Sequence, residues 1–293
     1  MHFPVLLEEV IFNLKPEVGD IILDATAGGG GHARAILEKI APGGKLITLD
    51  RDQEAVRRVR EELKDFQENL VALNENFKNV DKVLDSCNID RIDGALFDLG
   101  MSSFQLDEPE RGFSFSKDGS LDMRFNTSEG MTACDVVNKF SMADLAQIIK
   151  KYGEERHSKL VAKAIVEYRR SGRIQTTGEL AEIINKAIGR KYSRLKLHPA
   201  ARTFQALRIY VNDELGALEE GVKKALSFLS PTARICVISF HSLEDRIVKN
   251  IFRTMARVGD LELVVKKPVR PSEGEIDENP RSRSAKLRVA EKL

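Results

Sequence analysis

The sequence has no tryptophan, only three cysteines in 293 residues, and no long apolar run. Cys87, Cys134 and Cys236 are far apart and form no CxxC pair, so a disulfide framework and a zinc site are disfavoured and a reducing compartment is expected. No segment approaches 18 consecutive apolar residues, and residues 1–16 lack the basic start of a secretion signal. These absences predict a soluble, cytoplasmic protein.

Excess charge of one sign is also lacking, because 46 Lys and Arg face 45 Asp and Glu, a net charge of +1. This overall balance hides an uneven distribution of charge along the chain. Residues 150–208 carry 15 basic and 5 acidic side chains, and residues 186–208 carry seven basic ones and no acid. Solvated helical faces would explain this pattern. We favour a surface that binds a polyanion, and expect this polyanion to be a nucleic acid.

The first hundred residues alternate between apolar strands and helical patterns. Strands are expected at 21–26, 45–50, 70–73 and 92–99, with helices at 31–40, 52–66 and 80–86 between them. This alternation predicts a parallel sheet covered by helices on both faces.

The alternation stops near residue 100 and resumes later. An irregular segment reaches residue 130, helices follow to residue 189, and one long amphipathic helix is expected over 204–229. A strand (234–240), a helix (242–257) and two last strands (261–265, 285–290) complete the chain. The sequence predicts one doubly wound α/β domain, residues 1–104 and 203–293, with an all-helical domain inserted at 105–202.

The strongest local signal is Asp24–His32, in which a strand leads through a glycine turn into a helix. Gly28 and Gly30 leave room for a ligand to approach the backbone. Asp50 ends the next strand, where a carboxylate can accept both ribose hydroxyls of an adenosine. Asp50 as the N-cap of the following helix, and His32 as an ordinary polar residue of a first turn, are the plainer interpretations.

Dinucleotides and S-adenosylmethionine both suit this turn, and three features favour S-adenosylmethionine. Asp24 gives D-x-T-x-G-x-G, close to the D-x-G-x-G-x-G of class I methyltransferases, and lies where a cofactor ammonium group would be. The sheet is expected to end in a hairpin, 261–265 with 285–290. Asp98 ends the fourth strand, from which methyltransferases commonly address donor and acceptor.

Residues 98–125 are dense in polar and aromatic groups, which suits a lid over a flipped base. The rings of Phe113 and Phe115 could stack on the base, and the guanidinium groups of Arg111 and Arg124 could hold phosphate. Polar base edges could be read by Gln105, Ser102 and Ser103. For the two phenylalanines, burial between the domains is the simpler interpretation.

Several long motifs, in this order, resemble one bacterial family over nearly the whole chain. Besides PVLLEE at 4–9, they are GxGGH at 28–32, DLGxSSxQLD at 98–107, RGFSF at 111–115, LDMR at 121–124, YGEER at 152–156, TFQALRIYVN at 203–212, ISFHSLEDRIVK at 238–249 and NPRxRS at 279–284. The family is the MraW/RsmH family, whose members use S-adenosylmethionine to methylate the exocyclic N4 of a cytidine (cytosine 1402 in the family's naming) in 16S ribosomal RNA.

The resemblance implies a class I, Rossmann-like methyltransferase sheet with a helical substrate-recognition insert, small-subunit RNA as partner, and no metal. It implies cofactor contacts at Gly30, Gly31, His32, Asp50, Phe77, Asp98 and Gln105. Without the resemblance, we would expect Phe77 to be a core residue. The reaction needs a group that positions the cytosine amine and accepts its proton. Asp98 is the candidate, and a backbone carbonyl of 99–103 is its competitor.

Three further groups have open interpretations. His241 could serve the base, whereas Ser242 as N-cap with Asp245 would form a capping box. YGEER at 152–156 is more simply a C-cap glycine among solvated charges. Arg190, Lys191, Arg194 and Lys196 form an acid-free cluster in a loop-like stretch before Pro199, suited to bind RNA.

Two other functions remain as alternatives. A nicotinamide dehydrogenase would retain a dinucleotide rather than S-adenosylmethionine, and a non-catalytic RNA-binding assembly factor would incorporate no methyl group into RNA. The sequence leaves the oligomeric state open, with a homodimer among the options.

Overall fold

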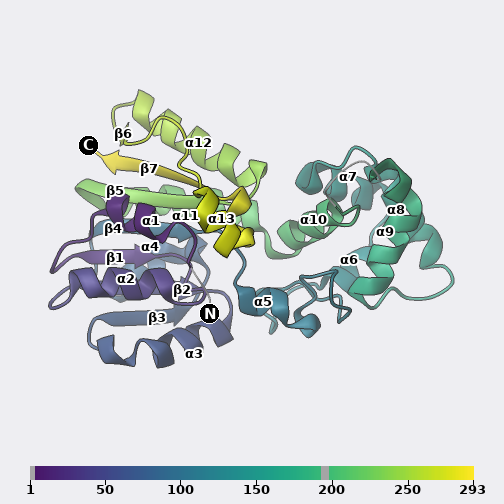
Figure 1. Cartoon of the computed structure of the whole chain (residues 1–293), viewed down its shortest axis with the longest axis horizontal. Helices are drawn as coiled ribbons and strands as arrows, with labels where there is room; N and C mark the ends of the chain where they lie inside the picture. The colour runs from purple at the N-terminus through teal and green to yellow at the C-terminus, as the bar shows by residue number, and fades with distance from the viewer. Residues whose placement is uncertain (1–3, 193–197) are drawn as a thin grey trace. The chain divides into compact units, whose positions relative to one another are not determined.

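The computed structural model describes residues 4–192 and 198–293, and its chain divides into two compact units (Figure 1). The sheet unit comprises the chain up to Met101 together with Leu215–Leu293, and the helical unit comprises Ser102–Glu214. The sequence pattern predicts these limits at 104/105 and 202/203. The second limit lies later because α10 (Ala201–Asn212) packs on α7 (Met142–Gly153) of the helical unit.

The sheet unit contains one seven-stranded sheet in the order β3-β2-β1-β4-β5-β7-β6. Strands β1 to β5 run parallel, and β7 pairs antiparallel with both β5 and β6. This order, with one antiparallel strand beside β5, is that of a class I methyltransferase, so the predicted fold class is confirmed. The strands are β1 (Ile21–Asp24), β2 (Lys45–Asp50), β3 (Leu70–Asn74), β4 (Ile92–Asp98), β5 (Leu229–Ser239), β6 (Leu261–Leu263) and β7 (Lys286–Lys292).

Successive strand residues face opposite sides of the sheet and build two cores. Ile22 and Leu96 belong to the core under α1, α2 and α3, whereas Leu23 and Phe97 belong to the core under α4, α11 and α12. The apolar strands are therefore buried on both faces, as expected for a parallel sheet. The helical segments of this unit are α1 (Leu7–Leu14), α2 (Gly31–Ile40), α3 (Gln53–Glu62), α4 (Val80–Ser86), α11 (Glu214–Phe228), α12 (Ser242–Arg257) and α13 (Glu273–Glu278), with short 3-10 turns η1 (Lys64–Phe66), η2 (Phe77–Asn79) and η4 (Pro280–Ser284).

The helical unit packs amphipathic helices around its own apolar core. Leu145 and Ile149 of α7, Val161 of α8 and Leu207 of α10 are fully buried. None of the helices in the described residues combines the length and apolar character that crossing a membrane requires. Besides α7 and α10, the unit contains α5 (Ser103–Asp107), η3 (Pro109–Arg111), α6 (Ala133–Lys139), α8 (Ser158–Tyr168) and α9 (Thr177–Tyr192).

The prediction of one long helix over 204–229 is wrong. Asp213 adopts a left-handed conformation (φ 48°) that ends α10, and α11 begins at Glu214. The apolar period continues through this position, so the break is made by the backbone at one residue and not by a change in pattern.

The YGEER motif at 152–156 also differs from expectation. Gly153 remains helical, and Glu154 takes the left-handed position (φ 49°) after α7. Glu155 is buried rather than solvated, and it accepts a hydrogen bond from the Tyr192 hydroxyl at the end of α9. The motif therefore ties the end of α9 to the end of α7.

Candidate functional site

Three aspartates end three neighbouring parallel strands of the sheet unit. Asp24 ends β1, Asp50 ends β2 and Asp98 ends β4, and β1 lies between the other two. In open α/β sheets, ligands bind beyond the carboxyl ends of the strands, at the point where the connections change direction. The sheet therefore brings all three predicted carboxylates to the edge where a ligand is expected.

The glycine turn joins β1 to α2 at this edge. Gly28 and Gly30 have positive φ values of 50° and 76°, a conformation in which a residue with a Cβ is strained. The Gly28 N–H donates to Oδ2 of Asp50 at 3.0 Å, and the Asp52 N–H donates to Oδ1 at 2.9 Å. Asp52, and not Asp50, caps α3. The plainer interpretation of Asp50 is therefore wrong, because its carboxylate holds the glycine turn instead.

Asp24 is the most buried of the three aspartates, with 1% of its surface exposed. Its carboxylate accepts hydrogen bonds from the Thr26 N–H at 3.1 Å and the Thr48 hydroxyl at 3.3 Å. Burial raises the pKa of Asp24 to about 8, and the charges of Asp98 and Asp50 add to the rise. A cation at this edge would relieve that repulsion.

Asp98 has polar neighbours on three sides. Its backbone N–H donates to the Thr26 hydroxyl at 2.8 Å, its Oδ1 accepts from the Gly100 N–H at 3.3 Å, and its Oδ2 lies 3.6 Å from Nδ1 of His32. The Asp98 side chain is 21% exposed, so it is reachable from solvent. Its position suits a group that contacts both cofactor and acceptor.

His32 is a buried member of the first turn of α2, and its Nε2 lies 3.0 Å from the Val5 carbonyl oxygen. The plainer interpretation, that His32 is an ordinary polar residue of a helix start, does not account for its contacts with the Val5 carbonyl and the Asp98 carboxylate. Phe77, by contrast, packs its ring edge-on against Phe97 at 5.6 Å and fills the space beside Gly221 of α11. The core interpretation of the Phe77 ring is thus supported, and contact with a cofactor stays a prediction.

The predicted site residues of the helical unit are engaged within that unit. Gln105 is buried, and with Ser102 it forms the capping box of α5. Arg111 donates to the backbone oxygens of Arg124 and Phe125, so its guanidinium group holds that loop together. Roles for these residues in cofactor or RNA binding stay predictions.

Arg124 and Phe113 likewise have partners in their own unit. The Arg124 guanidinium makes a two-point ion pair with Asp122, at 2.8 and 2.7 Å, which raises the pKa of Arg124. Phe113 is buried and stacks on Phe125 at 5.4 Å. Phe113 is therefore buried, as the simpler interpretation holds, while burial between the domains stays a prediction. Phe115 stacks on His198.

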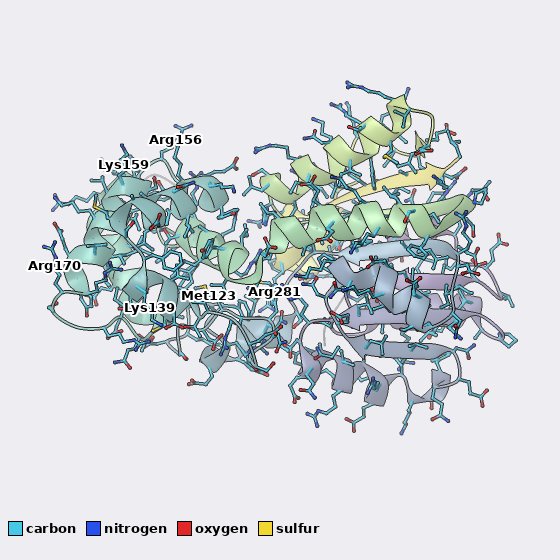
Figure 2. All side chains as sticks on the ribbon, turned by 180° about the vertical axis from the view of Figure 1, so that it is seen from behind. Met123, Lys139, Arg156, Lys159, Arg170 and Arg281 are labelled. Carbon is cyan, nitrogen blue, oxygen red and sulfur yellow. The ribbon has the colours of Figure 1, made fainter. Side chains whose placement is uncertain are left out.

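The basic residues of the helical unit are mainly on its surface. Arg190 and Lys191 are exposed in the last turn of α9, so they are helical and not loop residues as expected. Arg194 and Lys196 lie outside the described residues. Figure 2 shows further basic side chains that project from this unit, before, on and after α8: Arg156, Lys159 and Arg170.

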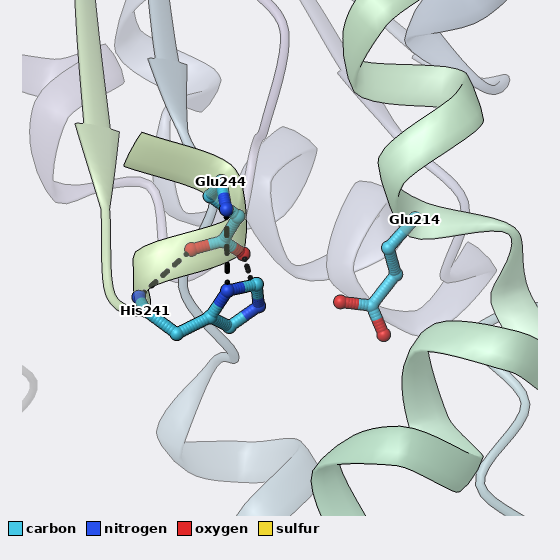
Figure 3. Close-up of side chains that lie close together, drawn as sticks. All are labelled: Glu214, His241 and Glu244. Carbon is cyan, nitrogen blue, oxygen red and sulfur yellow. Dashed lines mark hydrogen bonds and ion pairs between the residues drawn. The ribbon is translucent and has the colours of Figure 1, made fainter. Parts of the chain in front are cut away.

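His241 follows β5 and caps α12 (Figure 3). Its Nδ1 accepts from the Glu244 N–H at 3.3 Å, and the Glu244 carboxylate accepts from the His241 N–H at 3.1 Å. The capping box predicted one residue later, with Ser242 and Asp245, is wrong, because Asp245 pairs with Arg288 of β7 at 2.7 Å. A direct role of His241 toward a base stays a prediction.

Sequence reasoning missed two groups at the sheet edge. Thr26 links Asp24 to Asp98 through its hydroxyl, which lies 3.4 Å from the Asp24 carboxylate. Its signal was present, because Thr26 replaces a glycine of the usual methyltransferase turn. The contact from Val5 to His32 had no such signal, since it joins two separate motifs, 27 positions apart, and neither motif indicates the other as its partner.

Comparison with known proteins gives a match over the full length. A model of the MraW methylase family matches residues 1–293. The chain is 48% identical over 292 residues to "Ribosomal RNA small subunit methyltransferase H" of Sulfurihydrogenibium sp., which covers 100% of this chain and 99% of that protein. Proteins with the same name from Persephonella marina (47% identity) and Clostridium botulinum (45%) also match 100% of this chain and 99% of their own length.

Proposed function

Because the chain belongs to the MraW methylase family, we propose that it methylates the exocyclic N4 of a cytidine in the RNA of the small ribosomal subunit. The chain is a methyltransferase, and its methyl donor is S-adenosylmethionine. The observation that carries the proposal is the full-length match, at 48% identity, to a relative named for small-subunit ribosomal RNA methylation.

The sheet edge suits this cofactor. S-adenosylmethionine carries positive charge on its sulfonium and ammonium groups, and the edge gathers the carboxylates of Asp24, Asp50 and Asp98 beside a turn in which Gly28 and Gly30 have positive φ. In this proposal Asp24 lies toward the ammonium group, Asp50 toward the ribose, and Gly30, Gly31 and His32 border the cofactor. When bound, the cofactor supplies an electrophilic methyl group.

The protein must also prepare a poor nucleophile. The lone pair of the cytosine amine is delocalised into the ring, so the amine needs a partner that orients it and accepts its proton as charge develops. The Asp98 carboxylate is our candidate. Its backbone N–H and its Oδ1 are each held by a hydrogen bond, and its Oδ2 faces His32. The competitor is a backbone carbonyl of 99–103.

RNA binding is assigned to the helical unit. Arg190 and Lys191 on α9 and the basic side chains beside α8 are exposed, which suits contact with phosphates. The partner is then the small ribosomal subunit or its RNA, and the reaction takes place in the cytoplasm. A homodimer is left open.

The decisive experiment maps labelled methyl groups on small-subunit ribosomal RNA after incubation with the protein and labelled S-adenosylmethionine. One modified cytidine, methylated at N4, is expected. RNA that is bound but not methylated would favour an assembly factor, and retention of a nicotinamide dinucleotide in place of S-adenosylmethionine would favour a dehydrogenase. Methylation of another base or atom would overturn the cytidine N4 assignment.

A further inference from the structure

Residues 4–6, here called the N-terminal strap, lie against the glycine turn. The Pro4 ring occupies the space beside Gly31, so closely that a Cβ on Gly31 would lie 2.9 Å from a Pro4 ring carbon. The next residue places its carbonyl oxygen 3.0 Å from Nε2 of His32. The strap therefore contacts the start of α2 at two successive residues.

A second contact holds the strap from its other side. The Leu6 N–H donates to Oε1 of Glu275, in α13, at 2.8 Å. Leu6 is 1% exposed and adopts a positive φ of 55°, a conformation that a leucine takes only where its surroundings impose it. Glu275 thus fixes the residue that follows the Val5 carbonyl.

The strap determines which ring nitrogen of His32 carries hydrogen. A carbonyl oxygen only accepts, so the hydrogen between it and the ring must be on Nε2. In the neutral ring, Nδ1 is then the nitrogen without hydrogen, and it faces Oδ2 of Asp98 at 3.6 Å. Two acceptors that face each other repel, and one proton between them turns repulsion into attraction. The geometry makes the two side chains a joint acceptor for one proton.

We propose that His32 is a positioning residue for methyl transfer: it shares, through Nδ1, the proton that Asp98 takes from the substrate amine, and the N-terminal strap and Glu275 hold its ring for this role. The inference rests on the proposed function. It adds the fate of the proton, which that function leaves open.

The atoms balance as follows. A nitrogen–carbon bond forms to the methyl group as the sulfur–carbon bond breaks, and the electron pair of the broken bond stays on sulfur. The substrate nitrogen gives up one N–H proton to Oδ2 of Asp98, which then shares it with Nδ1 of His32. The 3.6 Å separation is expected to shorten when the proton arrives, as catalytic hydrogen bonds commonly do.

The first test does not depend on activity. Nitrogen-15 NMR of the imidazoles, with His32 assigned through its Gln variant, should show a protonated Nε2 in the wild type. Asp98→Asn should shift the Nδ1 resonance of His32, whereas Asp93→Asn, at the opposite end of β4, should not. Hydrogen on Nδ1 of His32 in the resting enzyme, either in place of Nε2 or on both nitrogens, would overturn the proposal.

The second test separates the two ring nitrogens during single-turnover methyl transfer at saturating S-adenosylmethionine. His32→Gln can still donate to the Val5 carbonyl but has no group at the Nδ1 position, and its rate should fall about tenfold or more. His32→Asn keeps a polar group near Nδ1, so it should retain more of the rate than the Gln variant if the variant folds. A wild-type rate in His32→Gln would overturn the proposal.

The third test addresses the strap through Glu275. Glu275→Ala should lower the single-turnover rate about threefold to tenfold and alter the His32 resonances. Glu275→Gln, which keeps an accepting oxygen, should restore both, and Glu278→Ala, an exposed change in the same helix, should alter neither. Equal behaviour of Glu275→Ala and Glu278→Ala would remove the strap from the proposal.

These outcomes are distinguishable from failure of the proposed function. If the wild type puts no methyl group on small-subunit RNA, that function fails and the proton route with it. If the wild type methylates a cytidine while His32→Gln matches its rate, only the proton route fails.

Discussion

The two units use their motifs in different ways. In the sheet unit, Asp24 and Asp98, which belong to motifs, meet Asp50 at one edge, and Asp98 keeps a partly exposed carboxylate there. In the helical unit, Arg111, Arg124 and Phe113 make their contacts with neighbouring residues of their own loop. A long motif thus marks either a reactive edge or a loop that must keep one conformation, and only the structure tells which.

The largest effect should come from the reactive edge. Asp98→Asn keeps the size of the side chain but removes the proton acceptor, so the single-turnover rate at saturating S-adenosylmethionine should fall about 100-fold or more. Rapid-quench measurement of labelled RNA tests this, with Asp93→Asn as the control on the same strand. A normal rate would leave Asp98 a cofactor or scaffold residue only.

Asp50→Ala should act on the cofactor instead of the chemical step. Loss of a hydrogen-bonded acceptor typically costs about 1–3 kcal/mol, so affinity for S-adenosylmethionine should fall on the order of 10–100-fold. Calorimetric titration measures it. Asp50→Asn, which keeps one accepting oxygen, should be intermediate. Unchanged affinity in a folded Ala variant would refute the ribose assignment.

The helical unit should respond mainly in stability where its motifs are structural. The Asn212 amide donates to the Met123 carbonyl at 2.7 Å and accepts from the Phe125 N–H at 2.8 Å, and it is buried. Asn212→Ala should lower the free energy of unfolding by about 1–3 kcal/mol, because both backbone groups lose a partner. Urea unfolding measures this, and the exposed Asn185→Ala should change it little.

The surface of the same unit should respond in RNA affinity. Replacing Arg190, Lys191, Arg194 and Lys196 together with Ser should weaken RNA binding about tenfold or more and flatten its salt dependence, because phosphate neutralisation is lost. Affinity for S-adenosylmethionine should stay near that of the wild type. Filter binding across a salt series decides it, and superimposable lines would remove this cluster from the interface.

A pH dependence of stability is expected at Asp24. Its folded-state pKa of about 8 lies above the ordinary value, so between these two values the folded state binds more protons than the unfolded state. Without cofactor, the stability contributed by Asp24 is therefore full below its ordinary pKa and is lost as the pH rises toward 8. The free energy of unfolding of the wild type, minus that of Asp24→Asn, should therefore fall between pH 5 and pH 8. Parallel curves for the two proteins would contradict the shift.

The sequence predicted the elements that a local pattern defines. Apolar runs located the strands, and the glycine turn located the start of α2 at Gly31. Where two local patterns compete, the sequence could not choose. His241 with Glu244 and Ser242 with Asp245 have the same spacing, and only the first pair caps α12. At Asp213 a single backbone conformation overrides a continuous apolar period.

Contacts between distant segments were beyond sequence reasoning. The hydrogen bond from Leu6 to Glu275 joins residues 269 positions apart, and neither residue stands in a pattern that predicts it. Thr26 could have been recognised, because it departs from the usual glycine at a named motif position. The arginines of the 98–125 segment could not, since an arginine that holds its own backbone looks the same in sequence as one that holds phosphate.

The pairing of β4 with β5 has a consequence for how the chain folds. Asp93 and Ser230, at the starts of these neighbouring strands, are joined by a hydrogen bond across 137 positions. During synthesis, one edge of β4 therefore stays unpaired until the ribosome has released the helical unit and then β5. Open edges of this kind recruit other strands, so the nascent chain passes through an aggregation-prone stage.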